Sequence, residues 1–206
     1  MGKSGWGKTT LLLNLLQPGW LDYSKLSIFG KSLFQPEYKI LRKGFEEQLP
    51  KEKIMRLFEN RDEILREQIS PNELIHELAK NRKTLSKEPI ECNFYELADD
   101  VPDPKELSPE QKNLMIFDNL LLQKQNKCEA YYVRGRHSNC DCLYLSQNYF
   151  KLPRQTIREN ANFFCLFPQD QKNIDHIFNN HVFQDMTKEQ FKKLCKTAWS
   201  KPHNLL

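Results

Sequence analysis

A glycine-rich segment at residues 2–9 has the composition and spacing of a phosphate-binding loop. It reads Gly-Lys-Ser-Gly-Trp-Gly-Lys-Thr and matches the pattern GxxxxGK[ST] in full. Glycines in this pattern let successive backbone N–H groups turn inward around a phosphate, the lysine reaches the β- and γ-phosphate oxygens, and the last hydroxyl binds Mg²⁺. Lys8 and Thr9 take the last two roles here. The pattern therefore predicts a site for a nucleoside triphosphate with Mg²⁺.

The residues after this loop are predicted to form the helix that such a loop precedes. Thr10 and residues 11–16 suit an apolar helix whose positive N-terminal end faces the phosphates, and Pro18-Gly19 would close it. The alternative is a chance glycine-rich turn, which the well-placed helix makes the weaker interpretation. The predicted nucleotide contacts are Gly2, Lys3, Ser4, Gly5, Trp6, Gly7, Lys8, Thr9 and Thr10.

An acid at the end of an apolar run is the second candidate. Residues 112–118 have the form of a buried parallel strand, and Asp118 stands at its carboxyl end, where α/β folds place their sites. We expect Asp118 to hold Mg²⁺ through a water molecule, opposite Thr9; the alternative is a core strand that ends in a helix-capping Asp. Asn119 follows, and an amide can orient a water but cannot accept its proton. Hydrolysis is then slow, or another acid, such as Asp103 or Glu129, supplies the base.

Two further residues are candidates for contact with the γ-phosphate. Gln147 ends the strand predicted after Asp118, a position that suits a sensor of the phosphate or of its water; the alternative is a simple strand-end polar residue. Arg158 could reach the γ-phosphate of a neighbouring subunit, a role typically worth about 10³ to 10⁵ in rate. The alternative is a surface arginine paired with Glu159, and Arg154 is a local competitor for the role.

A basic cluster lies between a predicted helix and a predicted strand. Arg134, Arg136 and His137 could contact DNA phosphates or a neighbouring subunit, or form a solvated basic turn. Together with His137, three cysteines suggest a zinc site. The spacing is poor, because Cys140 and Cys142 are one residue apart and enter a strand, so thiols that pack in the core are favoured. The zinc set would be Cys128, His137, Cys140 and Cys142.

The elements that must position these residues alternate between strands and helices. Strands are predicted at 22–29, 92–97, 112–118, 142–146 and 162–167, and helices at 36–45, 120–133 and, as two short helices, 173–199. Such alternation indicates an α/β fold with a parallel sheet flanked by helices. The heavily charged residues 50–87 predict an α-helical insert of two helices, with a break at Ser70-Pro71.

The glycine-rich motif begins one residue after Met1. A phosphate-binding loop normally follows a buried apolar strand, so we expect the sheet of the chain as written to lack that first strand. Its neighbours would have unpaired edges. Poor solubility is the expected consequence, and a monodisperse preparation that melts cooperatively would contradict it.

Composition is compatible with one intracellular domain spanning residues 1–206. The net charge is +4, from 31 Lys and Arg against 27 Asp and Glu, which permits a nucleic-acid partner without requiring one. Mean hydropathy is −0.71, and no run reaches the roughly 18 apolar residues of a membrane-spanning helix. The residues after Met1 do not form a secretory signal, so the six cysteines are expected to be reduced.

The order of motifs along the chain resembles one protein family. The motifs are the glycine-rich loop, Gln-Pro-Glu-Tyr at 35–38, the run ending at Asp118, Arg-Gly-Arg-His-Ser-Asn at 134–139, Leu-Ser-Gln-Asn-Tyr-Phe-Lys-Leu-Pro at 145–153 and Ile-Arg-Glu-Asn-Ala-Asn at 157–162. This series resembles the poxvirus-type DNA-packaging ATPases of the FtsK/HerA superfamily, which large DNA viruses and Polinton (Maverick) elements also carry. The match covers most of the chain apart from the insert at about 50–90.

The resemblance implies a RecA-like P-loop fold of the ASCE class and ATP hydrolysis with Mg²⁺. It also implies a homo-oligomeric ring, expected to be hexameric, that threads double-stranded DNA into a capsid beside a capsid protein or portal-site component. Lys8 and Thr9 match the phosphate and metal positions, Asp118 the metal-binding acid, Gln147 the sensor and Arg158 the arginine finger. The family usually has an acid where this chain has Asn119.

Three functions follow from these observations. The leading one is an ATP-driven translocase of double-stranded DNA, working at an intracellular site of virus or element assembly or in the virion. The second is a nucleotide-binding subunit that hydrolyses weakly or not at all, or a truncated relic, motivated by Asn119 and by the abrupt start. The third is a small-molecule kinase, for which the sequence offers no clear acceptor site or lid.

Overall fold

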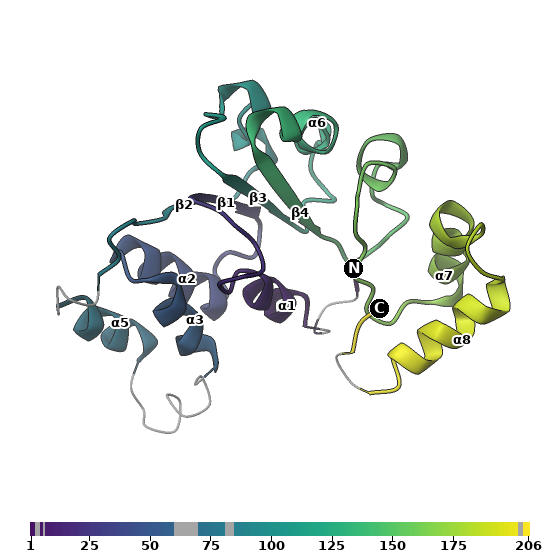
Figure 1. Cartoon of the computed structure of the whole chain (residues 1–206), viewed down its shortest axis with the longest axis horizontal. Coiled ribbons are helices and arrows are strands. Elements are labelled where there is room, and N and C mark those ends of the chain that lie inside the picture. Colours follow the sequence, from purple (N-terminus) through teal and green to yellow (C-terminus); the bar gives the residue numbers. More distant parts are fainter. Residues whose placement is uncertain (3–4, 6, 60–69, 81–84, 202–203) are drawn as a thin grey trace.

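Four parallel strands form the sheet on which the rest of the chain is arranged (Figure 1). The computed structural model describes residues 1–206 except 3–4, 6, 60–69, 81–84 and 202–203. The strands of this sheet are β1 (Lys25–Gly30), β2 (Glu91–Tyr95), β3 (Asn113–Asp118) and β4 (Cys140–Leu145), in the order β2-β1-β3-β4. The α/β class and the parallel sheet are confirmed, and the arrangement is compatible with a RecA-like fold.

The carboxyl ends of three neighbouring strands are level. Gly30 of β1 pairs with Asp118 of β3, and Asp118 pairs with Leu145 of β4. All three strands run in the same direction, so the segments that follow them emerge at one edge of the sheet. Ligands of open α/β sheets bind outside this carboxyl edge.

Helices cover both faces of the sheet, which explains why its inner strands, β1 and β3, are buried along nearly their whole length. One face carries α1 (Lys8–Leu15), α2 (Pro36–Glu46), α3 (Lys51–Glu59) and α5 (Pro71–Lys80) (Figure 1). Leu26 and Ile28 of β1 pack toward these helices. Phe29 and Phe117 belong to the opposite cluster, where Phe117 contacts Tyr131 of α6 (Asn126–Arg134).

Two helices of the charged region 50–87 lie where the sequence predicts them. α5 begins at Pro71, at the expected break, since proline is tolerated in the first turn of a helix. α3 approaches α2 closely: a Cβ added at Gly44 would lie 2.8 Å from Cγ1 of Ile54. The remainder of the predicted insert at residues 60–69 and 81–84 lies outside the described residues.

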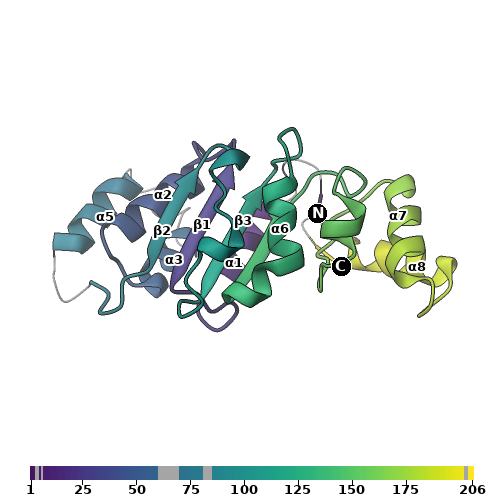
Figure 2. The same cartoon turned by 90° about the horizontal axis from the view of Figure 1, so that it is seen from above.

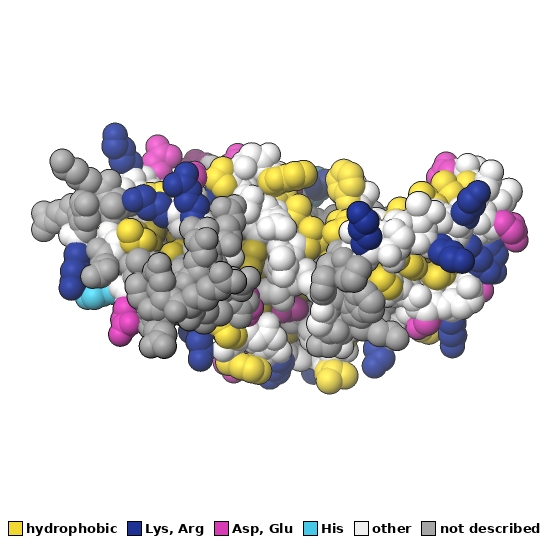
Figure 3. Space-filling model, turned by 90° about the horizontal axis from the view of Figure 1, so that it is seen from below, with side chains coloured by type: hydrophobic (Ala, Val, Ile, Leu, Met, Phe, Trp, Pro, Cys, Tyr) yellow, Lys and Arg dark blue, Asp and Glu magenta, His cyan; other side chains and the backbone are white. Residues whose placement is uncertain are grey.

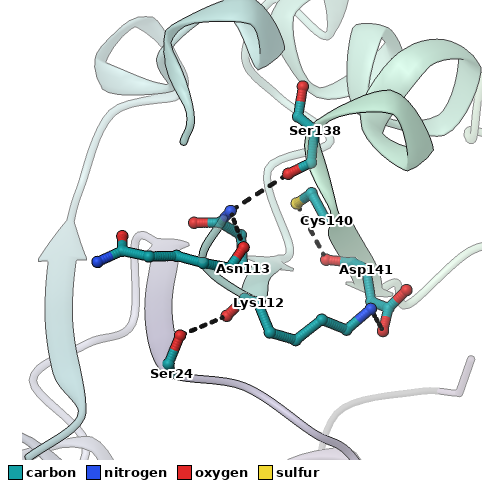
Figure 4. Close-up of polar contacts among 7 residues, drawn as sticks. Ser24, Lys112, Asn113, Ser138, Cys140 and Asp141 are labelled. Atoms are coloured by element: carbon teal, nitrogen blue, oxygen red, sulfur yellow. Dashed lines mark hydrogen bonds and ion pairs between the residues drawn. The ribbon is translucent and has the colours of Figure 1, made fainter. Parts of the chain in front are cut away.

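One buried asparagine fastens the amino-terminal edge of the sheet. Nδ2 of Asn113 donates to the backbone carbonyl of Ser138 at 3.2 Å (Figure 4). It also donates to the carbonyl of Ser108 at 3.0 Å. Beside it, Lys112 forms a 3.0 Å ion pair with Asp141. These contacts tie the loop before β3 to the start of β4 and fix the two strands relative to each other.

The predicted helix 120–133 begins later than expected. Asn119 has a left-handed backbone with φ 55°, and Leu120 is fully buried. The chain therefore leaves β3 through a turn, and α6 starts only at Asn126.

Residues 162–167 form no strand, so that prediction is wrong. The N–H of Phe167 donates to the carbonyl of Met1 at 2.8 Å, while Leu166 and Leu206 exchange two backbone hydrogen bonds on the other side. Single-residue contacts on each side cannot build a ladder. The segment therefore lies against both chain termini rather than along β4.

Two helices form the C-terminal end of the molecule, as predicted. They are α7 (Gln171–Ile177) and α8 (Lys188–Ala198). Ile177 and Phe191 from these helices pack with Tyr149 in a third core cluster. The pair lies beyond the chain termini at the end remote from β2 (Figure 2), and Lys and Arg side chains gather over it (Figure 3). None of the described helices is both long and apolar enough to span a membrane.

Candidate functional site

A cavity of about 780 Å³ lies at the carboxyl edge of the sheet, where α1 begins. Its walls come from the glycine-rich loop, from residues after β1, and from the ends of β3 and β4. The cavity brings together Lys8, Thr9, Asp118 and Gln147, four predicted site residues that are far apart in the sequence. The expectation that these side chains share one site is consistent with this geometry.

The loop before α1 turns through left-handed glycines. Gly5 has φ 79° and Gly7 φ 88°, and Gly7 accepts the first helical hydrogen bond, from Leu11 at 2.8 Å. A Cβ at Gly5 would meet no atom within 4 Å, so backbone conformation rather than space demands glycine there. Both glycines and Thr10 line the cavity. The predicted contacts Lys3, Ser4 and Trp6 lie outside the described residues.

Gly2 is buried between two segments, whereas Gly5 and Gly7 line the cavity. It is buried, and its N–H donates to the carbonyl of Ser146 at 3.1 Å. A Cβ added to it would lie 2.6 Å from Cβ of Phe167. Gly2 therefore permits two segments to approach each other, and it is not among the described residues that line the cavity.

Lys8 projects from the start of α1 across the loop. Its Nζ donates to the carbonyl of Gly2 at 2.7 Å. Burial lowers the pKa of Lys8, whereas the nearby charge of Asp118 favours the protonated ammonium. Lys8 thus places a positive charge in the same wall of the cavity as the backbone of the glycine-rich loop.

Asp118 is held by a residue for which the sequence analysis predicted no role. The hydroxyl of Tyr38, from the first turns of α2, donates to Oδ2 of Asp118 at 2.7 Å. The side chain of Thr9 is close enough to the same hydroxyl to act on it, in the direction that lowers the pKa of Tyr38. Gly30 leaves room for this acid, because a Cβ there would lie 3.2 Å from Cβ of Asp118. Tyr38 therefore joins the two residues expected to hold Mg²⁺.

Burial controls the protonation of this pair. It raises the pKa of Asp118, against the hydrogen bond from Tyr38 and the positive charge of Lys8. Burial and the neighbouring carboxylate raise the pKa of Tyr38 well above its ordinary range, so the phenol keeps its proton and stays a donor. The arrangement offers a carboxylate and hydroxyls, the hard oxygen donors that Mg²⁺ prefers. These residues fit a divalent ion of that kind.

Two amides face the same cavity. Asn119 follows Asp118 directly, and its N–H donates to the carbonyl of Leu145 at 2.9 Å, which fixes the turn after β3. Gln147, two residues beyond the end of β4, lines the cavity with an exposed side chain. Both can orient a water or a phosphate oxygen, and neither can take up a proton.

Arg158 lies away from the cavity. Its guanidinium stacks 4.7 Å from the ring centre of Tyr149, and its buried Nε has no hydrogen-bond partner among the described residues. Glu159 pairs with Arg154 at 3.1 Å, so the alternative of a surface arginine paired with Glu159 is wrong. Arg158 instead forms part of the packing between residues 149–150 and the C-terminal helices.

The basic cluster is also distant from the cavity. Arg134, Arg136 and His137 are exposed and lie between α6 and β4, at the amino-terminal edge of the sheet. The cavity lies at the opposite edge.

The cysteines considered for a zinc site are not part of a metal-binding cluster. In the part of the chain that the structure describes, no three or more His, Cys, Asp or Glu side chains come together in a group that could hold a metal. Burial raises the pKa of Cys140 and Cys142 to about 12. These thiols pack in the core.

The wall after β1 contains the residues that sequence reasoning missed. Ser32, Gln35 and Glu37 line the cavity, and Tyr38 reaches Asp118 behind it. Their position at the cavity could have been predicted, because they follow a strand whose carboxyl end lies level with that of β3.

Comparison with models of known families, with characterised proteins and with solved structures found no match to this chain.

Proposed function

We propose that this cavity binds ATP with Mg²⁺ and hydrolyses it. The observation that carries the proposal is the convergence of Lys8, Thr9, Asp118 and Gln147 on one cavity beside left-handed glycines at the start of a helix. Backbone N–H groups at a helix start attract phosphate, and lysine adds a compact positive charge. A polyphosphate is the ligand that this combination suits best.

Each residue has a distinct task in the proposed reaction. Lys8 neutralises the β- and γ-phosphate oxygens, and Gln147 orients the attacking water or the γ-phosphate. Thr9 and Asp118 hold Mg²⁺, which when bound supplies Lewis-acid stabilisation of the transferring phosphoryl group. Tyr38 fixes the carboxylate of Asp118 by its hydrogen bond.

We propose further that hydrolysis drives double-stranded DNA into a capsid, through a homo-oligomeric ring of this P-loop, RecA-like chain. Support comes from the order of the motifs at 134–139, 145–153 and 157–162, which resembles that of poxvirus-type packaging ATPases. The exposed Arg134 and Arg136 suit contact with phosphates of DNA or with a neighbouring subunit.

A second candidate is a subunit that binds ATP but hydrolyses it weakly. The observation that favours it is Asn119, an amide in the cavity directly after the metal-binding acid. Under this alternative Asn119→Glu would raise turnover substantially.

ATP hydrolysis with Mg²⁺, measured with and without duplex DNA, tests the proposal. We expect turnover that duplex DNA stimulates and that Lys8→Ala lowers by about 10²- to 10³-fold, as loss of one charge-stabilising group does. Lys172→Ala, at an exposed lysine of α7, is the matched control and should leave turnover unchanged. ATP binding without turnover would favour the weak subunit, and turnover that ignores DNA would contradict the motor.

A further inference from the structure

We propose that Glu37 is the general base of the reaction. It would replace the acid that the packaging ATPases usually have at the position of Asn119. The inference rests on the proposed hydrolysis of ATP. Of the described residues that line the cavity, Asp118 and Glu37 are the carboxylates. Asp118 is the proposed metal ligand, so it does not serve as the proton acceptor. Proton acceptance therefore falls to the other acid.

The acids named from the sequence lie outside the cavity. Asp103 caps a short helical turn, accepting from the N–H of Lys105 at 3.0 Å. Glu129 accepts from the hydroxyl of Thr156 at 2.6 Å, on the side of the sheet that α6 covers. Neither lines the cavity.

The fold positions Glu37 by three features. β1 ends at Gly30 level with Asp118, so α2 starts at the same edge of the sheet as the predicted metal-binding acid. Glu37 lies in the first turn of α2, a position where helices favour acidic residues. The next residue, Tyr38, is hydrogen-bonded to Asp118, which fixes that turn of the helix relative to β3.

Glu37 is also accessible from the cavity. Its side chain is half-buried, unlike that of Asp118, which is only 9 % exposed. Its neighbours on this wall, Ser32 and Gln35, are polar and half-buried as well. The proposal places the attacking water between this wall and the γ-phosphate, in the cavity that Lys8 also lines.

The Glu37 carboxylate takes a proton from water as the water oxygen forms a bond to the γ-phosphorus. The bond from that phosphorus to the β,γ-bridging oxygen breaks, and its electron pair leaves on ADP. The proton on Glu37 then passes to solvent, which restores the carboxylate. Asn119 orients the water through its amide.

Glu37→Gln separates this role from binding, because glutamine keeps the size of the side chain and cannot accept the proton. We expect turnover to fall by about 10²- to 10⁴-fold, the usual contribution of a general base, while the Kd for ATP with Mg²⁺ stays within about threefold, since glutamine keeps the shape and polarity of the wall. Glu46→Gln, at an exposed position of the same helix, should change neither quantity. In the Glu37→Gln background, Asn119→Glu should restore part of the turnover.

The outcomes are distinguishable. Wild-type turnover in Glu37→Gln overturns the role of Glu37 and leaves ATP hydrolysis standing. Equal loss of binding and turnover in that variant also overturns it, because Glu37 would then be a binding residue. A wild-type chain that neither binds nor hydrolyses ATP overturns the proposed function itself, and this inference with it.

Discussion

The hydroxyl of Tyr38 on α2 donates a 2.7 Å hydrogen bond to Oδ2 of Asp118 at the end of β3. A helix and a strand that are 80 residues apart in the sequence therefore meet at one buried pair of oxygens. The contact places the first turn of α2, with Glu37, on the same cavity as the glycine-rich loop. The proposed chemistry of the cavity depends on this contact.

Tyr38→Phe should lower both stability and the affinity for ATP with Mg²⁺. It leaves a buried carboxylate without its donor, which typically costs about 1.5–3 kcal/mol, and it frees Asp118 to leave the orientation that metal binding needs. Tyr131→Phe is the control, because its hydroxyl donates to the Pro102 carbonyl at 2.9 Å, away from the cavity. Urea unfolding and calorimetric titration measure the two effects. Affinity loss of equal size in both variants would contradict the role of Tyr38.

Asp118→Asn should raise the free energy of unfolding at pH 8. Burial raises the pKa of Asp118 above its ordinary value of 3.8, so the charged form is disfavoured in the folded state. That cost is present in full above the folded pKa and disappears below the unfolded one. The advantage of the variant, followed by urea unfolding between pH 8 and pH 4, should therefore shrink as the pH falls. A variant less stable than wild type at pH 8 would contradict this, and Asp185→Asn, at an exposed site, serves as the control.

His181 should make the protein less stable as the pH falls below about 6.5. Burial and the charge of Arg158 lower the pKa of His181 in the folded state, so the unfolded chain takes up the proton first. His181→Gln should flatten the fall in melting temperature between pH 7 and pH 5. His137→Gln, at an exposed histidine, should leave the slope unchanged. Equal slopes in wild type and His181→Gln would show that this histidine is not the titrating group.

Gly44→Ala should destabilise the contact of α2 with α3. The added Cβ would lie 2.8 Å from Cγ1 of Ile54, which is fully buried, and such overpacking typically costs about 1–3 kcal/mol. Gly135→Ala is the matched control, because the nearest atom to its added Cβ would be the carbonyl oxygen of Cys140, at 3.4 Å. Unfolding in urea compares the two. An unchanged free energy of unfolding in Gly44→Ala would mean that the helices separate without cost.

Local patterns were sufficient for the sheet and for part of the cavity. Residues 114–117, directly before Asp118, are all apolar, as is typical of a strand buried on both faces. The carboxyl-edge rule then brings Asp118 and Gln147 to the glycine-rich loop. Residues 162–167 have the same apolar character, but a strand also needs neighbours along its length. That condition depends on the path of distant segments, here both chain termini.

The second wall of the cavity depends on tertiary packing. The sequence predicts α2 but not its rotation, and the rotation decides that Tyr38 turns to Asp118. Arg158 is a similar case, because its burial on Tyr149 arises where the chain folds back after β4. Charged residues at such positions have no periodic signal that distinguishes them from a solvated surface.

Calorimetric titration with a non-hydrolysable ATP analogue and Mg²⁺ tests the central claim most directly. We predict one site in the wild-type chain, unchanged in Lys172→Ala and weakened at least about tenfold in Lys8→Ala, since a charge-assisted contact to phosphate contributes roughly 1.5–3 kcal/mol. Omission of Mg²⁺ should weaken binding as well. Equal affinity in wild type and Lys8→Ala, or no binding in either, would contradict a nucleotide site in this cavity.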